Sequence, residues 1–234
     1  MLSARDVHAY YGDSYVLHGI SLEAEPGRLT VLMGRNGVGK TTILRAILGL
    51  TPPRRGSVQF VGEELTRLST HQIAKRGLSI VPQGRRVFRS LTVREHLLTA
   101  ARARTDQESW TIERVFDLFP PLKKRIDQRA RYLSGGEQSM LAIARALRTE
   151  PRCLLMDEPT EGLAPMYVDI VLEVVRELKQ QGNLALLVVL PELPLALAVA
   201  DYVYVMRKGE VAFEGPVQEL ADRKDVQEQH IGIG

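Results

Sequence analysis

The chain has 234 residues, which suits one large α/β domain or one domain with a small inserted subdomain. Hydrophobic residues make up 44% of it, enough for a full core, and its one cysteine, Cys153, excludes a disulfide framework and a cysteine zinc site. The net charge of +3 comes with basic clusters but little aromatic interleaving. We therefore expect solvated helix faces and contacts to a nucleotide or a protein partner, and no nucleic-acid partner.

The N-terminal segment has the pattern of antiparallel strands. Apolar residues alternate with polar ones from Leu2 to about Glu25 and again from Ser57 to Val61. Tyr11 stands directly before Gly12 and has two interpretations. Its ring packs as an ordinary strand aromatic, or it offers a face to a purine base. The residues by themselves favour packing.

A glycine-rich stretch follows the predicted strand Leu29–Met33 and precedes the predicted helix Ile43–Leu48. The stretch comprises Gly34, Arg35, Asn36, Gly37, Val38, Gly39, Lys40, Thr41 and Thr42, with the spacing G-x-x-x-x-G-K-[ST]. Since glycine makes up about 7% of residues in proteins, a random chain of this length matches with a probability of roughly one in a hundred. We therefore predict a nucleotide site.

The chemistry of this site follows from its residue types. The glycines let successive backbone N–H groups turn toward phosphate oxygens, and the following helix points its positive N-terminus at the same anion. Lys40 reaches the terminal phosphates, and the Thr41 hydroxyl ligates Mg²⁺. ATP and Mg²⁺ are the expected cofactors.

Gln83 comes just beyond the predicted buried strand Leu78–Val81, at the end where α/β ligand sites lie. A glutamine there could reach a metal or a water. The chain then becomes helix-rich and charged: Thr92 opens a helix with a capping box, and Ser109–Phe119 predicts another helix that Pro120 ends. We interpret residues of about 84–148 as a helical subdomain inserted between sheet strands.

A second capping box has Ser134 at the N-cap and Glu137 at the third helical position. The simple interpretation is that Ser134 only caps the helix. Gly135 and Gly136 add bare backbone that a ligand can approach closely. A capped helix end with bare backbone is an anion site in its own right.

An acid pair ends the next predicted strand, Cys153–Asp157. Asp157 would hold Mg²⁺, directly or through water. Glu158 would polarise the attacking water as a general base. The alternative, that both are exposed strand-end charges, is disfavoured by the phosphate loop upstream.

The last third of the chain alternates helices and strands. We predict a helix and three strands at Asp169–Gln181, Leu184–Leu190, Tyr202–Met206 and Glu210–Phe213. This alternation indicates a mainly parallel sheet covered on both faces. The most apolar segment, Leu184–Ala200, is interrupted by Pro191 and Pro194 and is short for a membrane span. We expect a soluble chain that reaches a membrane only through a partner.

Four motifs occur in an order that resembles one family. They are the glycine loop, Gln83, the run Leu133-Ser134-Gly135-Gly136-Glu137-Gln138, and the run Leu154-Leu155-Met156-Asp157-Glu158. Over essentially the entire chain, this order is similar to the ATP-binding subunit of an ABC transporter. The Leu-Ser-Gly-Gly-Glu-Gln run is the most specific part, because P-loop ATPases outside the ABC group lack it. The resemblance implies one α/β domain over residues 1–234, with the fold of a P-loop NTPase of ABC type. This fold would have a core with a mainly parallel sheet, an N-terminal antiparallel β subdomain and the inserted helical subdomain.

The resemblance also implies partners and residue roles. Tyr11 would stack on adenine, and Gln83 would sense Mg²⁺ and face the membrane subunit. Ser134 and Gly136 would bind the γ-phosphate held by a second ATPase subunit, because two such subunits sandwich two ATP molecules head to tail. Transmembrane permease subunits, and indirectly a periplasmic or extracellular solute-binding protein, complete the expected assembly at the cytoplasmic face of the cell membrane.

Three stretches narrow the resemblance. Residues 34–39, 81–88 and 157–165 are similar to importers for branched-chain amino acids and for urea or short amides. The Arg-Asn-Gly-Val and Pro-Thr-Glu-Gly segments look closer to the urea type. An ATPase subunit of this family does not touch the transported solute.

The chain departs from the family in two places. Most ABC ATPases have a switch histidine about ten residues before the aspartate matched by Asp201, and the branched-chain group often has glutamine there. Here that position is Pro191, which has neither a donor side chain nor an N–H. The run Glu161-Gly162-Leu163-Ala164 also lacks the aspartate found in many relatives. We expect slow hydrolysis at the site that uses this switch segment, and a nonidentical partner ATPase with a more competent second site.

Two other functions compete with a transporter ATPase. A soluble ABC-type ATPase acting on nucleic acid or the ribosome usually has two ATPase domains or a long coiled-coil insertion, for which this chain has no room. A regulatory subunit that holds nucleotide and hydrolyses it slowly is favoured by the missing histidine and disfavoured by Glu158.

Overall fold

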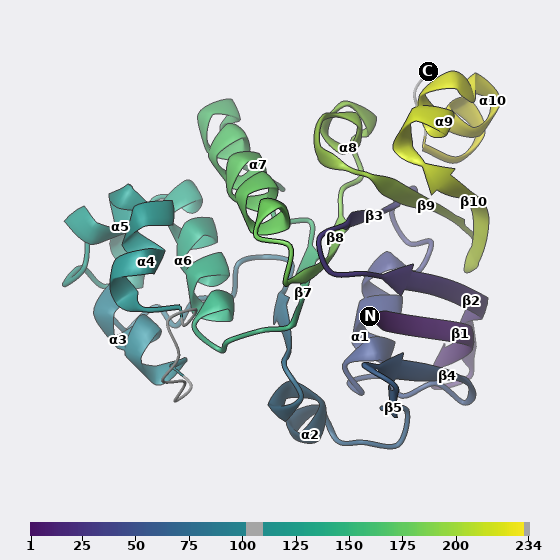
Figure 1. Ribbon diagram of the computed structural model, residues 1–234, viewed down its shortest axis with the longest axis horizontal. Coiled ribbons are helices and arrows are strands. Elements are labelled where there is room, and N and C mark those ends of the chain that lie inside the picture. Colours follow the sequence, from purple (N-terminus) through teal and green to yellow (C-terminus); the bar gives the residue numbers. More distant parts are fainter. Residues whose placement is uncertain (102–109, 232–234) are drawn as a thin grey trace.

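The computed structural model describes residues 1–101 and 110–231, which form two sheets with helices between and around them (Figure 1). The first sheet is antiparallel, with its strands in the order β2-β1-β4-β5. Its strands are β1 (Leu2–Tyr11), β2 (Ser14–Ala24), β4 (Arg55–Phe60) and β5 (Glu63–Glu64). The antiparallel N-terminal sheet expected from the alternating pattern is confirmed.

The second sheet has the order β10-β9-β3-β8-β7-β6. Its strands are β3 (Leu29–Met33), β6 (Leu78–Val81), β7 (Cys153–Asp157), β8 (Ala185–Val189), β9 (Tyr202–Arg207) and β10 (Glu210–Pro216). All neighbours are parallel except β9 and β10, which form a hairpin around Lys208–Gly209. The carboxyl ends of β3, β8, β7 and β6 therefore meet at one edge of the sheet.

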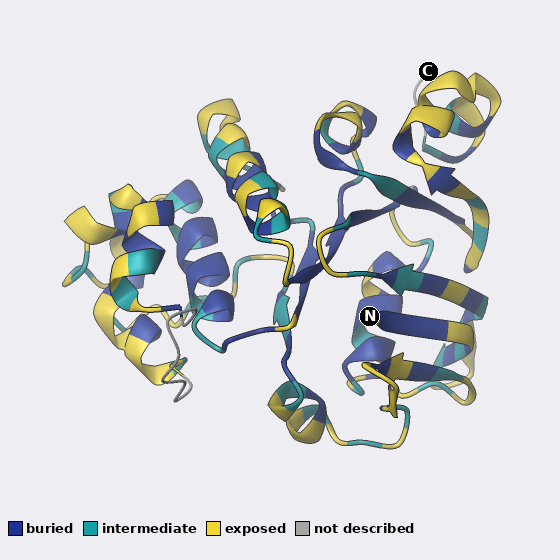
Figure 2. Ribbon diagram, viewed as in Figure 1, coloured by how far each residue is buried: buried dark blue, intermediate teal, exposed yellow. Residues whose placement is uncertain are grey.

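Alternate residues of the central strands enter two hydrophobic cores. Val31 and Leu154 contribute to the core that also contains α6 (Gly135–Leu147) and α7 (Pro165–Gln180). Leu32 and Leu155 contribute to the core shared by α1 (Lys40–Ile47) and the antiparallel sheet. Strands β3, β7 and β8 are buried along their whole length, as expected of parallel strands covered on both faces (Figure 2).

The other described helices are shorter than α1, α6 and α7. They are α2 (Thr70–Lys75), α3 (Val93–Thr99), α4 (Ile112–Leu118), α5 (Pro120–Lys124), a 3₁₀ turn (Ala130–Tyr132), α8 (Leu193–Val199), α9 (Val217–Asp222), α10 (Lys224–Val226) and a π turn (Gln227–Ile231). Helices α3 to α6 gather on one side of the molecule (Figure 1). No helix within residues 1–101 and 110–231 is long and apolar enough to cross a membrane.

Two helix starts differ from the sequence prediction. The helix predicted from Ser109 begins at Ile112, where the Thr111 hydroxyl accepts the N–H of Arg114; Ser109 itself lies outside the described residues. The same helix, α4, ends at Leu118 just ahead of Pro120, as predicted, and Pro120 then begins the separate helix α5. Pro165 likewise begins α7, ahead of the predicted start at Asp169. The reason is the same in both cases: the first turn of a helix needs no backbone N–H from proline.

Candidate active site

The phosphate loop joins β3 to α1 at the carboxyl edge of the parallel sheet. Gly34 has a φ of 132°, and a Cβ there would come within 2.5 Å of the Met206 carbonyl oxygen, so only glycine fits. The loop borders a cavity of about 320 Å³ lined by Asn36, Gly37, Gly39, Lys40, Thr41, Thr42, Gln83 and Glu158. A helix N-terminus facing such a space is an arrangement that binds phosphate.

Lys40 is held by the loop it belongs to. Its side chain is only 5% exposed, and Nζ donates to the carbonyl oxygens of Gly34 at 2.8 Å and Arg35 at 3.1 Å. The same nitrogen lies 3.5 Å from Oε1 of Glu158. The Arg35 side chain points elsewhere, since its Nη2 donates to the carbonyl of Glu228 at 3.4 Å, and Val38 packs against the core beside α1.

Asp157 ends β7 and is 2% exposed. Burial raises the pKa of Asp157, while the Thr41 hydroxyl and the Lys40 ammonium lower it. Its Oδ1 is buried and has no hydrogen-bond partner among the described residues, which is costly for a polar atom. A hard cation with oxygen ligands would offset that cost, so the residues at this point fit Mg²⁺.

Glu158 follows in a left-handed backbone conformation with a φ of 49°. Burial raises the pKa of Glu158, and the Glu161 and Asp157 carboxylates raise it further, whereas Lys40 lowers it. A carboxylate with a raised pKa is better suited to accept a proton near neutral pH. The geometry thus brings a candidate general base beside the lysine of the phosphate loop.

Gln83 reaches the same place from the end of β6. Its Nε2 donates to Oε2 of Glu161 at 3.0 Å and to Oε2 of Glu158 at 3.3 Å. Because both carboxylates need a donor, the amide nitrogen faces them and the carbonyl oxygen Oε1 is left as an acceptor. That oxygen suits a water or a metal ion.

Tyr11 lies apart from the phosphate cavity. The residue is 44% exposed at the end of β1, so part of its surface is open to a ligand. The guanidinium carbon of Arg45, on the helix that the phosphate loop opens, stands 5.8 Å from the ring centre.

Ser134 and Gly136 also lie outside the lining of the phosphate cavity, at the N-terminus of α6. The capping box is present as predicted: the Ser134 hydroxyl accepts the Glu137 N–H, and the Glu137 carboxylate accepts the Ser134 N–H at 2.8 Å. The ring of Tyr167 covers Gly136, and the Tyr167 hydroxyl lies 3.3 Å from the Ser134 hydroxyl.

Pro191 stands just beyond β8. This strand lies between β3, which leads into the phosphate loop, and β7, which carries the acid pair. The N–H of Leu190 donates to the carbonyl of Leu32 at 3.2 Å, and Glu192 then caps α8. The segment with the missing histidine therefore lies at the same edge of the sheet as Lys40 and Asp157.

Three residues near the site were not predicted to act there. They are Arg85, Glu161 and Tyr167, which contact the turn after Glu158, Gln83 and Gly136 respectively. Arg85 belongs to the basic cluster formed by Arg85, Arg86 and Arg89, and Glu161 follows the acid pair. Neither position has a pattern that separates it from an exposed charge. Tyr167 gives no sequence signal, because its contact depends on how α7 packs against α6.

The phosphate loop after β3, the buried Lys40 and the acid pair after β7 define a P-loop nucleoside triphosphatase. The sequence model of the ABC transporter family matches residues 17–161, more than half of the chain. The chain therefore belongs to the ABC transporter family, as its ATP-binding subunit, and the resemblance inferred from its motifs is confirmed.

The relatives are full-length matches. The chain is 38% identical over 234 residues to the high-affinity branched-chain amino acid transport ATP-binding protein BraG of Pseudomonas aeruginosa, covering 99% of this chain and 100% of that protein. It is 34% identical to the probable LivF protein of Archaeoglobus fulgidus (100% and 99% covered) and 27% identical to BraF of Pseudomonas aeruginosa (95% and 94% covered). A crystal structure of a nucleotide-free ATP-binding cassette from an ABC transporter superposes with a TM-score of 0.85 at 27% identity, covering 100% of this chain and 99% of that one. The predicted fold class is confirmed.

Proposed function

We propose that this chain hydrolyses ATP to power a membrane importer for branched-chain amino acids or for urea and short amides. The observation that carries the ATPase activity is the contact between Lys40 and Glu158 at 3.5 Å, beside the buried Asp157. This contact places Lys40, which would bind phosphate, beside Glu158, which would act as the general base. The solute class is supported by the full-length similarity to BraG, a branched-chain amino acid transport protein.

Each side chain has one role in the proposed reaction. Lys40 binds the terminal phosphate oxygens, and Thr41 and Asp157 would hold Mg²⁺, which neutralises phosphate charge when bound. The water oxygen attacks the γ-phosphorus while the bond to the ADP oxygen breaks, and Glu158 takes the proton of that water. Gln83 orients the water through Oε1. Because Lys40 Nζ contacts the Glu158 carboxylate, a phosphate oxygen of ATP has to replace that carboxylate at Nζ.

The proposed assembly is a dimer of ATPase subunits on a permease. Tyr11 would stack on adenine, and Ser134 and Gly136 would bind the γ-phosphate held by the other subunit. Residues of about 84–148 form the helical subdomain that docks on the permease, at the cytoplasmic face of the membrane. The 13-residue helix α6 directs its positive N-terminal end to this point, which supports an anion site there.

Pro191 supports a slow site in this chain and a nonidentical partner ATPase. It lies at the sheet edge beside the acid pair yet supplies no donor to the reaction. BraF and BraG, two branched-chain transport ATPases of one organism, are both full-length relatives of this chain, which fits a pair of different subunits. The same observation favours, as the second candidate, a regulatory subunit that holds ATP and barely cleaves it.

The test is co-purification of this chain with its membrane subunits, followed by reconstitution of that complex in liposomes with a solute-binding protein. The proposal expects ATP hydrolysis that rises when leucine or urea is supplied to the binding-protein side, and the solute that stimulates identifies the class. Lys40→Ala should abolish nucleotide binding, while Lys75→Ala, on the distant α2, should not. Binding without stimulated turnover would support the regulatory subunit instead.

A further inference from the structure

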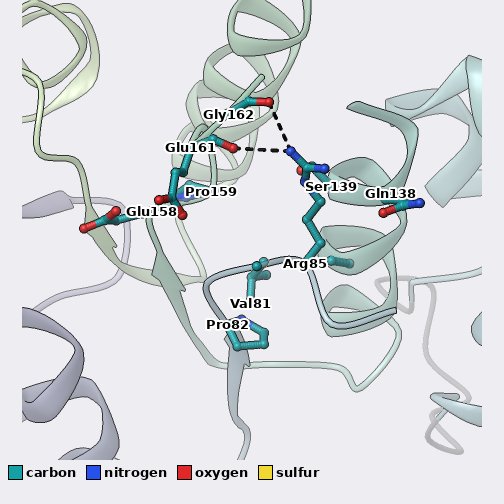
Figure 3. A pocket seen from close by; sticks show the side chains of 11 residues that line it. Val81, Pro82, Arg85, Gln138, Ser139, Glu158, Pro159, Glu161 and Gly162 are labelled. Atoms are coloured by element: carbon teal, nitrogen blue, oxygen red, sulfur yellow. Dashed lines mark hydrogen bonds between the residues drawn. The ribbon is translucent and has the colours of Figure 1, made fainter. Parts of the chain in front are cut away.

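Arg85 lies where three segments of the chain meet. Its Nη2 donates to the carbonyl oxygens of Gly162 at 3.1 Å and Glu161 at 3.4 Å, in the turn that follows Glu158 (Figure 3). Next to it stands the first residue of α6, since a Cβ on Gly135 would come within 2.7 Å of Nη1. Arg85 also has a φ of 64°, a left-handed backbone conformation that is strained for a residue other than glycine. Such a conformation persists only where the surroundings hold it.

The carbonyl groups that Arg85 binds belong to two overlapping tight turns, at residues 158–161 and 160–163. The N–H of Glu161 donates to the carbonyl of Glu158 at 3.1 Å, and the N–H of Leu163 donates to the carbonyl of Thr160 at 3.3 Å. A shift of the backbone at Gly162 therefore moves the backbone of Glu158. Gln83 adds a contact from the same segment as Arg85, because its Nε2 donates to the Glu161 carboxylate at 3.0 Å.

The simpler explanation is that Arg85 is an exposed cation of a basic cluster. Its side chain is half-buried instead, and it lines a cavity of about 320 Å³ that shares Glu158 with the phosphate cavity. Arg89, four positions further along the same connection, shows the contrast. It is exposed, and within the described residues its side chain makes no hydrogen bond or ion pair.

We infer that Arg85 is a positioning residue for Glu158: it fixes the turn at residues 158–162 against the start of α6, so that the Glu158 carboxylate stays at the wall of the phosphate cavity. The inference rests on the proposed ATPase function. In that proposal the end of α6 serves the opposite nucleotide, so Arg85 also connects the two nucleotide sites of a dimer.

The experiment compares Arg85→Ala, Arg85→Lys and the control Arg89→Ala in the full-length protein. Steady-state ATPase assays separate kcat from KM, and hydrogen exchange without ATP follows the amides of Glu161 and Leu163. We expect Arg85→Ala to lower kcat by roughly 10- to 100-fold, the cost of a misplaced catalytic group. KM for ATP should stay within about twofold, because the phosphate loop is untouched. Arg85→Lys should recover part of kcat, since it keeps one donor, and Arg89→Ala should match the wild type.

The ATPase assay and the hydrogen-exchange measurement together distinguish failure of this inference from failure of the proposed function. Faster exchange at Glu161 and Leu163 in Arg85→Ala, with unchanged exchange in the phosphate loop, supports the inference. Wild-type kcat and wild-type exchange in Arg85→Ala would overturn it, and so would a joint loss of kcat, ATP affinity and thermal stability. A wild-type protein that binds no ATP would instead refute the proposed function, while the exchange measurement would still test the hold of Arg85 on the turn.

Discussion

The ring of Tyr167 lies directly on Gly136, so closely that a Cβ on this glycine would overlap the ring, and the Tyr167 hydroxyl is 3.3 Å from the hydroxyl of Ser134. The two residues that the ABC resemblance assigns to phosphate binding are thus packed against α7. The glycine at this position is needed for packing within the chain, whatever it does for a ligand.

Gly136→Ala is expected to destabilise the protein by about 1–3 kcal/mol, the usual cost of overpacking. The reason is the collision with Tyr167. Urea unfolding of Gly136→Ala, Tyr167→Ala and the double variant measures it. The double variant should cost less than the sum of the single ones, because the ring that collides is gone. Additive costs would show that the two residues do not touch.

Glu158→Gln is expected to lower ATP turnover by about 10²- to 10⁴-fold, the usual contribution of a general base, with little change in ATP affinity. Single-turnover hydrolysis and equilibrium nucleotide binding give the two quantities. Glu177→Gln, on α7, serves as the control for loss of one negative charge. Turnover within twofold of the wild type would remove Glu158 from the proposed mechanism.

The raised pKa of Glu158 predicts that the free energy of unfolding depends on pH, and the Glu158→Gln variant tests this. Because burial raises the pKa of Glu158 in the folded protein, stability is full below the ordinary pKa of 4.5 and is lost as the pH rises through the folded value. Glutamine does not ionise. The free energy of unfolding without nucleotide should therefore increase in Glu158→Gln relative to the wild type as the pH rises from 4 to 7, measured by urea unfolding. A difference that narrows over this range would contradict the assigned direction.

Two buried side chains, Cys153 and Tyr204, predict that the protein loses stability at alkaline pH. Burial raises the pKa of Cys153 from 9.0 to about 12, and it raises the pKa of Tyr204 from 10.0 to about 12. Stability is full below each ordinary value and is lost as the pH rises toward the folded one, by up to about 1.4 kcal/mol per pH unit and group. Between pH 9 and 11, Cys153→Ala/Tyr204→Phe should lose less stability than the wild type. Thiol labelling at pH 8 should be slow until urea unfolds the protein.

Pro191→His is expected to raise ATP turnover by about tenfold or more, since a donor would stand at the edge of the sheet beside Asp157. Pro191→Ala is the matched control, because it removes the ring without adding a donor. Turnover of the purified protein is measured for all three chains. A fast wild type with no gain in Pro191→His would end the idea of a slow site.

The sequence was sufficient for features that short motifs encode. The phosphate loop, the strand Cys153–Asp157 and the capping box at Ser134 are predictable from local patterns, because each depends on residues within one turn or strand. Contacts across the fold were not predictable. The bonds from Arg85 to Gly162 and from Gln83 to Glu161 join segments far apart in the chain, and the left-handed backbone of Glu158 has no residue signal. The exposure of Tyr11 is not predictable either, since alternation in a strand does not say what covers each face.

The alternation of β3, β7 and β8 between two cores has a consequence for folding. Neighbouring residues such as Leu154 and Leu155 belong to different cores, so neither core survives loss of the strands. Unfolding should therefore be a single cooperative transition in which the antiparallel sheet and the helices α6 and α7 melt together. Fragments that separate these parts would each keep half of a hydrophobic sheet exposed, and they should aggregate rather than fold.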